Sequence, residues 1–177
     1  MKIWISPLRE AHNVAARARP ASAVSLLSPG DVFPRFEAVD DDEHHKVSLH
    51  DIREPQEGRT APAEDHVLAL IAFLKGWNPD ETLLVHCWAG ISRSTATAFI
   101  GACLHNPHAD EAAIAGAVAD ASPTAFPNTR IVSIADDLMG RKGRMAEAVK
   151  AICADMQRLT IVSRTDEAEP FHIPSRF

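Results

Sequence analysis

Cys87 and Arg93 stand six positions apart in the stretch His86–Ser94, and this spacing predicts a site for an anion. A cysteine attacks as its thiolate, which positive surroundings stabilise. Arg93 supplies a permanent charge and a planar fork that can hold two oxygens of a phosphate group. A cysteine and an arginine within one short loop are therefore suited to nucleophilic attack on phosphorus.

The residues around this pair are suited to wrapping backbone amides around a phosphate. Gly90, halfway along the loop, allows a turn that a side chain would obstruct. Ser94 can donate a hydrogen bond to the thiolate and ease its later departure, and His86 can order the backbone of the nucleophile. The expected phosphate-binding set consists of Arg93 and the loop residues Trp88, Ala89, Gly90, Ile91 and Ser92.

An apolar run precedes this loop and a helix-compatible run follows it. The first predicts a buried strand over 83–85 and the second a helix over 93–105. The amino end of a helix carries free N–H groups and a partial positive charge, and both favour a bound anion. The strand, the loop and the helix together predict a phosphate cradle around Cys87.

Strands alternate with helices in the first half of the 177-residue chain, and helices dominate the second half. This order predicts an α/β fold in which helices flank a central, mostly parallel sheet, built as a single domain over residues 1–177. From about residue 163 we expect a flexible polar tail. The expected strands cover 3–6, 23–27, 46–50, 83–85 and 159–162, and the expected helices cover 9–19, 64–76, 93–105, 110–121, 129–139 and 144–156.

The composition of the chain limits the classes of protein to which it can belong. A net charge of −6 without a lysine-rich block argues against non-specific binding of nucleic acid. No apolar run reaches the length of a membrane span, and the first residues lack the apolar core of a signal peptide. The three cysteines show neither disulfide nor zinc spacing, and none of the nine histidines has ligand spacing. We therefore expect a cytoplasmic protein without a metal or organic cofactor; the sequence gives no oligomeric state.

The stretch His86–Ser94 resembles the signature of the cysteine-dependent protein tyrosine phosphatase superfamily, H-C-x5-R-S/T. Its second half, Ala89–Ser94, is most similar to the dual-specificity branch. A second resemblance is Phe126-Pro127-Asn128 before a helix, because dual-specificity phosphatases carry Pro-Asn at similar spacing. The resemblance implies the fold of these enzymes, a phosphocysteine intermediate without a cofactor, and a brace for the phosphate loop at Asn128. Asn128 is equally suited to capping the following helix.

The chain also departs from this family. It contains no tyrosine, so the aromatic recognition loop of classical tyrosine-specific enzymes is missing in its usual form. The loop between Cys87 and Arg93 carries no lysine, whereas members that act on lipid phosphates often have basic residues there. A phosphoinositide substrate is therefore disfavoured.

The resemblance further implies a general acid, an aspartate on a loop upstream of the cysteine. Asp51 is the best match, because it follows an expected strand and precedes the cysteine by 36 residues, which leaves room for one helix and one strand. At the carboxyl end of a parallel strand it would face the same rim as the cradle. Glu64 and Asp65 are alternatives, but they fall in the first turn of a helix, where acids stabilise the helix dipole. Glu54 shares the loop of Asp51.

The sequence thus predicts a phosphomonoester hydrolase that acts on a phosphorylated protein. A phosphatase for nucleotides, sugars or inositol phosphates, and a phosphate-binding module without turnover, are the alternatives. Rhodaneses and arsenate reductases also pair a loop cysteine with oxyanions, but the Ser92-Arg93-Ser94 ending favours a phosphatase. Cys103 is expected in the core, with a protective disulfide to Cys87 as the alternative. The basic cluster 141–144 is expected to be a solvated turn rather than a docking patch.

Overall fold

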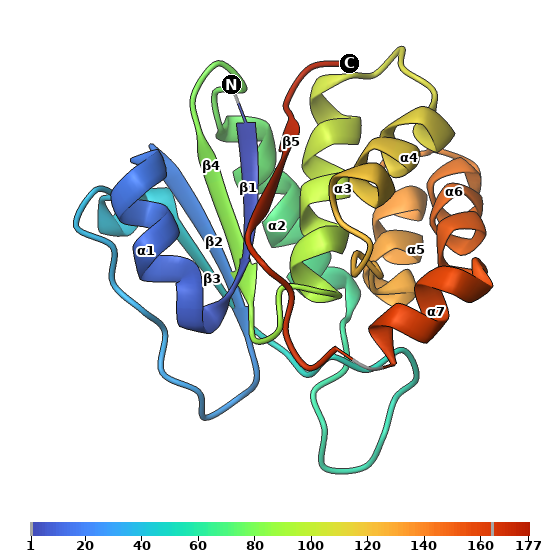
Figure 1. Cartoon of the computed structure of the whole chain (residues 1–177), viewed down its shortest axis with the longest axis horizontal. Coiled ribbons are helices and arrows are strands. Elements are labelled where there is room, and N and C mark those ends of the chain that lie inside the picture. Colours follow the sequence, from blue (N-terminus) through green and yellow to red (C-terminus); the bar gives the residue numbers. More distant parts are fainter. Residues whose placement is uncertain (1, 164) are drawn as a thin grey trace.

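Five strands form one sheet in the order β3-β2-β4-β1-β5 in the computed structural model, which describes residues 2–163 and 165–177 (Figure 1). The first four strands are parallel, and β5 is antiparallel to β1 at the edge of the sheet. Their bounds are β1 Lys2–Pro7, β2 Ser22–Leu27, β3 His44–Ser48, β4 Leu83–Cys87 and β5 Phe171–Pro174.

Helices cover both faces of this sheet. Figure 1 shows α1 on one face and the larger group of helices on the other. The described residues form the helices α1 Leu8–Ala18, α2 Glu64–Gly76, α3 Arg93–His105, α4 Glu111–Ala121, α5 Thr129–Leu138, α6 Arg144–Cys153 and α7 Met156–Val162, with a short 3-10 turn at Asp41–Glu43. The expected α/β architecture with a mostly parallel sheet is therefore confirmed.

Strand β4 lies in the middle of the sheet, and all five of its residues are buried. Successive side chains of a strand point to opposite faces. Val85 and Cys87 accordingly belong to the core under the larger group of helices, whereas Leu84 packs in a second core with α1 and Phe36. This alternation explains why the run before the signature is apolar without interruption.

Helix α3 runs through the centre of the larger layer, and its residues 93–103 are all buried. A helix that is buried on every side needs small residues where it meets its neighbours, and α3 supplies Ala96, Ala98 and Ala102. Its amino end lies at the carboxyl edge of the parallel strands. The loops after β2, β3 and β4 therefore meet the start of α3 at one rim.

The structure corrects three local expectations. The third strand begins at His44, two residues earlier than expected. The strand expected at 159–162 is wrong, because these residues belong to α7, in which the N–H of Leu159 donates to the carbonyl of Asp155. Part of the expected polar tail forms β5, where Phe171 and Ile173 are buried against the sheet. No described helix combines the length and the apolar character that crossing a membrane requires.

The basic cluster 141–144, between α5 and α6, binds α4 and the end of α3. The carboxylate of Glu111 is buried and receives Arg141 at 3.0 Å and Arg144 at 3.1 Å. Arg141 also donates to the carbonyl of Cys103 at 2.7 Å. The expected solvated turn is therefore wrong for Arg141, whose guanidinium ties α4 and the end of α3 to this cluster.

Candidate active site

Cys87 ends β4, and its sulfur lies at the centre of the loop that leads into α3. The side chain is buried, the N–H of Gly90 donates to Sγ at 3.3 Å, and Ser94 Oγ lies 3.2 Å from Sγ. Both neighbours can donate a hydrogen bond to a thiolate. The structure thus brings together Cys87, Gly90 and Ser94 as the sequence predicts.

The backbone of the loop is turned so that its amides face inward. Across a trans peptide the C=O and the following N–H point in opposite directions. Carbonyls that are tied to the outside of the loop therefore aim the N–H groups of residues 89, 90, 92 and 93 at its centre. Four carbonyls accept such outer bonds from backbone N–H groups: Trp88 from Leu8 (3.0 Å), Ala89 from Ala168 (2.8 Å), Ile91 from Phe126 (3.0 Å) and Ser92 from Asn128 (3.2 Å).

Gly90 is required by its conformation and by its surroundings. Its φ is +73°, a left-handed value that side chains disfavour. A Cβ at this position would lie 2.7 Å from the backbone nitrogen of Pro7 and 2.9 Å from the carbonyl carbon of Ser6. The loop therefore packs directly against the end of β1, and only glycine leaves enough room.

Arg93 lies beneath the loop with its guanidinium held by two neighbouring segments. Its side chain is 5% exposed; Nη1 donates to the carbonyl of Leu49 at 2.9 Å and lies 3.5 Å from the hydroxyl of Ser28. The Nε group is buried and has no hydrogen-bond partner among the described residues. A buried donor without a partner costs free energy, which an anion in the cradle would recover.

Asp51 reaches the cradle from the loop after β3. Its Oδ1 accepts hydrogen bonds from the hydroxyl of Ser92 and from Nδ2 of Asn128, both at 2.7 Å. Its Oδ2 lies 3.8 Å from Nε of Arg93. Oδ1 already accepts two hydrogen bonds, whereas Oδ2 lies toward Arg93 and the anion site. Oδ2 is therefore the oxygen that could exchange a proton with a bound ester.

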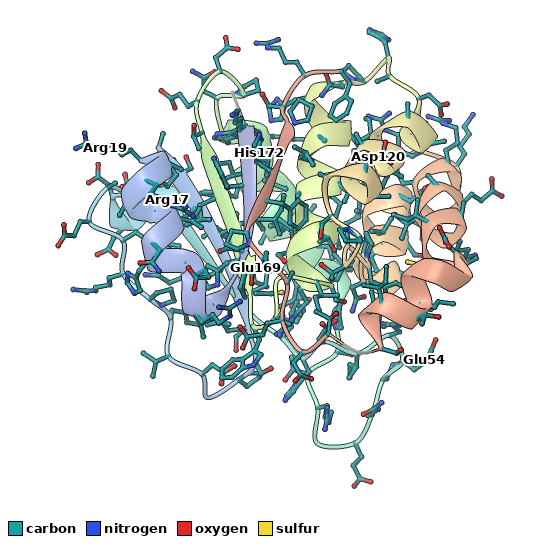
Figure 2. All side chains as sticks on the ribbon, in the orientation of Figure 1. Arg17, Arg19, Glu54, Asp120, Glu169 and His172 are labelled. Carbon is teal, nitrogen blue, oxygen red and sulfur yellow. The ribbon has the colours of Figure 1, made fainter. Side chains whose placement is uncertain are left out.

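Two of the alternative acids, Asp65 and Glu64, lie away from the cradle. Asp65 is 82% exposed and accepts a hydrogen bond from the N–H of His66 at the start of α2, as expected for an acid in a first turn. Glu64 lines a different depression with Arg130. Glu54 is an exposed residue of the loop that also carries Asp51, and it lines the same depression as Asp51 and Ser92; Figure 2 shows it below α7. Among the described residues, Asp51 is the expected acid whose carboxylate hydrogen-bonds to the loop and lies near Arg93.

Asn128 makes the contacts that both expected roles require, and one further contact. Its Oδ1 accepts from the N–H groups of Arg130 and Ile131 at 3.1 Å, which caps α5. Its own N–H donates to the carbonyl of Ser92, which braces the loop. Its Nδ2 in addition holds Asp51, and no signal in the sequence indicates that contact.

His86 is fully buried behind the loop. Its Nδ1 lies 3.4 Å from the carbonyl oxygen of Cys87, and its Nε2 lies 2.5 Å from the hydroxyl of Ser25. Burial lowers the pKa of His86 to about 4, so the ring is neutral at pH 7. Ser25 and its further partner His44 were not expected near the site, because they belong to other strands.

A shallow pocket of about 500 Å³ adjoins the cradle. Its wall includes the apolar side chains of Ile91, Phe126 and Val162, with Asp51 at one side. The guanidinium of Arg53 lies 4.8 Å from the centre of the Phe126 ring. Trp88, next to the nucleophile, is 52% exposed. This surface can receive the part of a molecule that carries the phosphate.

Cys103 is a core residue, as expected, and the fold argues against the alternative of a disulfide to Cys87, since both are free thiols in this structure. It lies nine residues beyond Ser94 along α3, or about 13 Å at 1.5 Å per residue. A disulfide needs Cα atoms within about 7 Å. Burial also raises the pKa of the Cys103 thiol to about 12. Among the described residues, no group of three or more histidine, cysteine or acidic side chains could hold a metal ion.

No protein-family model matches the chain, and no curated protein matches it in sequence. Solved structures do match it. Human DUSP28 is 20% identical, with 84% of this chain and 94% of that chain covered and a TM-score of 0.58. The PTP-2 phosphatase of Cydia pomonella is 23% identical, with 77% of this chain and 85% of that chain covered and a TM-score of 0.57. DUSP15 is 19% identical, with 93% of each chain covered and a TM-score of 0.56. The chain therefore shares the fold of these phosphatases.

Proposed function

We propose that the protein is a cysteine-dependent phosphomonoester hydrolase of the protein tyrosine phosphatase type, in its dual-specificity-like branch. One observation carries this proposal. The sulfur of Cys87 lies among inward-facing amides, with an unpaired N–H of Arg93 and a free oxygen of Asp51 within 3.8 Å of each other at the same rim. Nucleophile, anion receptor and acid are the three groups that phosphoryl transfer to a thiol requires.

The first step forms a phosphocysteine. The thiolate of Cys87 attacks phosphorus, and the bond from phosphorus to the ester oxygen breaks. Arg93 and the loop amides hold the three equatorial oxygens. Asp51 gives its proton to the departing oxygen, so the alcohol or phenol leaves neutral. A positioned acid of this kind contributes about 10²–10⁴ in rate.

The second step hydrolyses the intermediate. Asp51, now ionised, takes a proton from a water molecule that attacks phosphorus. The bond from sulfur to phosphorus breaks, inorganic phosphate forms, and the hydroxyl of Ser94 donates to the returning thiolate. Neither step draws on a metal or an organic cofactor.

The proposed substrate is a phosphorylated protein. The pocket beside the cradle is open, and its apolar wall of Ile91, Phe126 and Val162 suits a phosphorylated side chain presented on a surface. Likeness to dual-specificity phosphatases supports the same substrate class. We further propose that residues 1–177 act as one domain in the cytoplasm, where reducing conditions keep a catalytic thiol free.

Hydrolysis of an aryl phosphate by four proteins tests the proposal. Wild type and Cys153→Ser should be active, Cys87→Ser should be inactive, and Asp51→Asn should be slowed about 10²-fold or more. Rapid acid quenching followed by mass spectrometry should find phosphate on Cys87. Hydrolysis by Cys87→Ser would refute the mechanism, and full activity of Asp51→Asn would place the acid elsewhere.

Two further outcomes separate the alternatives. Binding of phosphate by an inactive wild-type protein would indicate a binding module. Phosphotyrosine and phosphothreonine peptides compared with nucleotide, sugar and inositol phosphates would distinguish a protein phosphatase from a small-molecule phosphatase.

A further inference from the structure

Three polar side chains form a buried row behind the phosphate loop, and the mechanism above uses none of them. The hydroxyl of Ser25 on β2 lies 2.5 Å from Nε2 of His86 on β4 and 2.7 Å from Nε2 of His44 on β3. Ser25 and His86 are direct partners in the parallel register of β2 and β4. All three residues are buried.

This row lies on the opposite face of the sheet from the nucleophile. Side chains alternate along β4, so His86 points to the α1 face and Cys87 to the α3 face. The ring of Phe36 packs on the α1 face, 5.1 Å from the His44 ring and 5.9 Å from the His86 ring. The row is therefore shielded from water, and the carbonyl of Cys87 joins it to the phosphate loop.

The hydrogen bonds of this row are consistent with one proton arrangement. Burial lowers the pKa of both His44 and His86 to about 4, so at pH 7 each ring has one donor nitrogen and one acceptor nitrogen. The carbonyl of Cys87 can only accept, which places the proton of His86 on Nδ1. Nε2 of His86 then accepts from the hydroxyl of Ser25. The oxygen of Ser25 in turn accepts from the N–H of His44.

The arrangement has a consequence for the phosphate loop. When His86 holds the carbonyl of Cys87, the following N–H, that of Trp88, points the opposite way, into the cradle. The four carbonyl tethers described above come from backbone groups, whereas this one comes from a side chain. It can therefore be altered without changing the loop itself.

We infer that Ser25, oriented by His44, is a positioning residue that fixes the proton of His86 on Nδ1 and thereby aims the amide of Trp88 at the bound phosphate. The titratable and charged groups that act on His86 are His44, His12 and Arg93, and Cys87 acts on it through its backbone carbonyl. Neither Ser25 nor His44 touches the substrate. Their effect on turnover rests on the proposed phosphatase activity, but their effect on His86 and on phosphate binding does not.

The test compares Ser25→Ala with Ser6→Ala. Ser6 flanks His86 on its other side, on β1, and its buried hydroxyl has no hydrogen-bond partner in the described residues, so Ser6→Ala removes the same atom without touching the row. The first readout is the pair of ¹⁵N chemical shifts of His86, which report the protonated nitrogen. The second is protection of Cys87 from alkylation by inorganic phosphate. Neither readout requires turnover.

In Ser25→Ala we expect His86 to show a mixture of tautomers, and phosphate protection to weaken about fivefold to tenfold, the effect of one lost hydrogen bond. Ser6→Ala should match the wild type in both readouts. A Ser25→Ala protein that keeps the proton on Nδ1 and binds phosphate as tightly as Ser6→Ala would overturn the inference. A wild type that binds phosphate without hydrolysing esters would refute the phosphatase and leave this comparison intact.

A second pair decides the matter if Ser25→Ala does not fold. His44→Gln keeps an N–H donor within reach of Ser25, and His44→Leu does not. We expect His44→Gln to resemble the wild type and His44→Leu to bind phosphate about two- to threefold more weakly, with mixed His86 tautomers. Equal phosphate protection and equal His86 shifts in the two variants would overturn the inference.

Discussion

The side-chain amide of Asn128 donates to Oδ1 of Asp51 at 2.7 Å and so joins the amino end of α5 to the loop after β3. The same side chain caps α5 through its oxygen, which accepts from Arg130 and Ile131. One residue therefore serves the stability of a helix through one atom and the placement of the proposed acid through another. The two roles can be separated by substitution.

Asn128→Ser should separate them, because serine keeps a capping oxygen but has no donor that reaches Asp51. We expect kcat on an alkyl phosphate, whose leaving group needs protonation, to fall about tenfold to a hundredfold while the melting temperature changes little. Asn128→Ala should show the same kinetic loss and also lose about 1 kcal/mol of unfolding free energy. An unchanged kcat in Asn128→Ser would mean that Asp51 is held without this contact.

Gly90→Ala should damage both stability and activity. The substitution places a Cβ 2.7 Å from a backbone atom of β1 at a left-handed φ, so the loop must shift. We expect a loss of about 2–3 kcal/mol in the free energy of unfolding by urea, and hydrolysis reduced more than about a hundredfold. Gly140→Ala is the control, since φ there is +65° but, beyond its chain neighbours, no atom of the described residues lies within 4 Å of the added Cβ. It should cost only about 1 kcal/mol and leave hydrolysis intact; equal losses in the two variants would contradict the packing argument.

Stability should fall as the pH is lowered from about 6.5 to about 4. Burial lowers the pKa of His44 and of His86 from 6.5 to about 4, so in this window the unfolded chain binds protons that the folded protein does not. The contribution of these two rings to the free energy of unfolding is fully present above pH 6.5. It is lost progressively down to pH 4, by on the order of 2–3 kcal/mol for each ring. Urea unfolding at several pH values measures this slope. The slope should be shallower in His44→Gln, and an identical slope in that variant would contradict the assignment.

Ala168→Pro should weaken the phosphate cradle from outside. The N–H of Ala168 donates to the carbonyl of Ala89 at 2.8 Å, and proline removes that donor. We expect phosphate to protect Cys87 from alkylation about fivefold to tenfold less well, because the peptide that carries the N–H of Gly90 loses its tether. Ala168→Ser keeps the N–H and should bind phosphate like the wild type. Equal binding by the two variants would show that the tether is dispensable.

The parts of the site that lie close together in the sequence could be predicted from it. Cys87, Arg93 and Ser94 are placed by one strand, one loop and one helix, and their spacing fixes their geometry. Asp51 could be expected near them because the carboxyl ends of parallel strands share a rim. The fold class followed from the same alternation of strands and helices.

The parts that depend on contacts across the fold could not be predicted. Ser25 meets His86 only because β2 and β4 pair in one particular register, which no local pattern specifies. The hold of Asn128 on Asp51 joins residues 77 positions apart. The apolar run at 159–162 fits a strand and a helix equally well, and the four residues of β5 are too few to show a clear alternation.

The segment that tethers the phosphate loop is synthesised long after the loop itself. Arg9 pairs with Glu167 at 2.6 Å and with Glu169 at 3.1 Å, and Figure 2 shows Glu169 beside the start of α1, so the segment that tethers Ala89 is docked on the first helix. Ala168 follows Ala89 by 79 residues, which a ribosome adds in about 4–16 s at ~5–20 residues per second. For that interval the nascent chain carries its nucleophile without a finished cradle. Until the segment that carries Ala168 has been made, the carbonyl of Ala89 therefore lacks the tether that orients the N–H of Gly90.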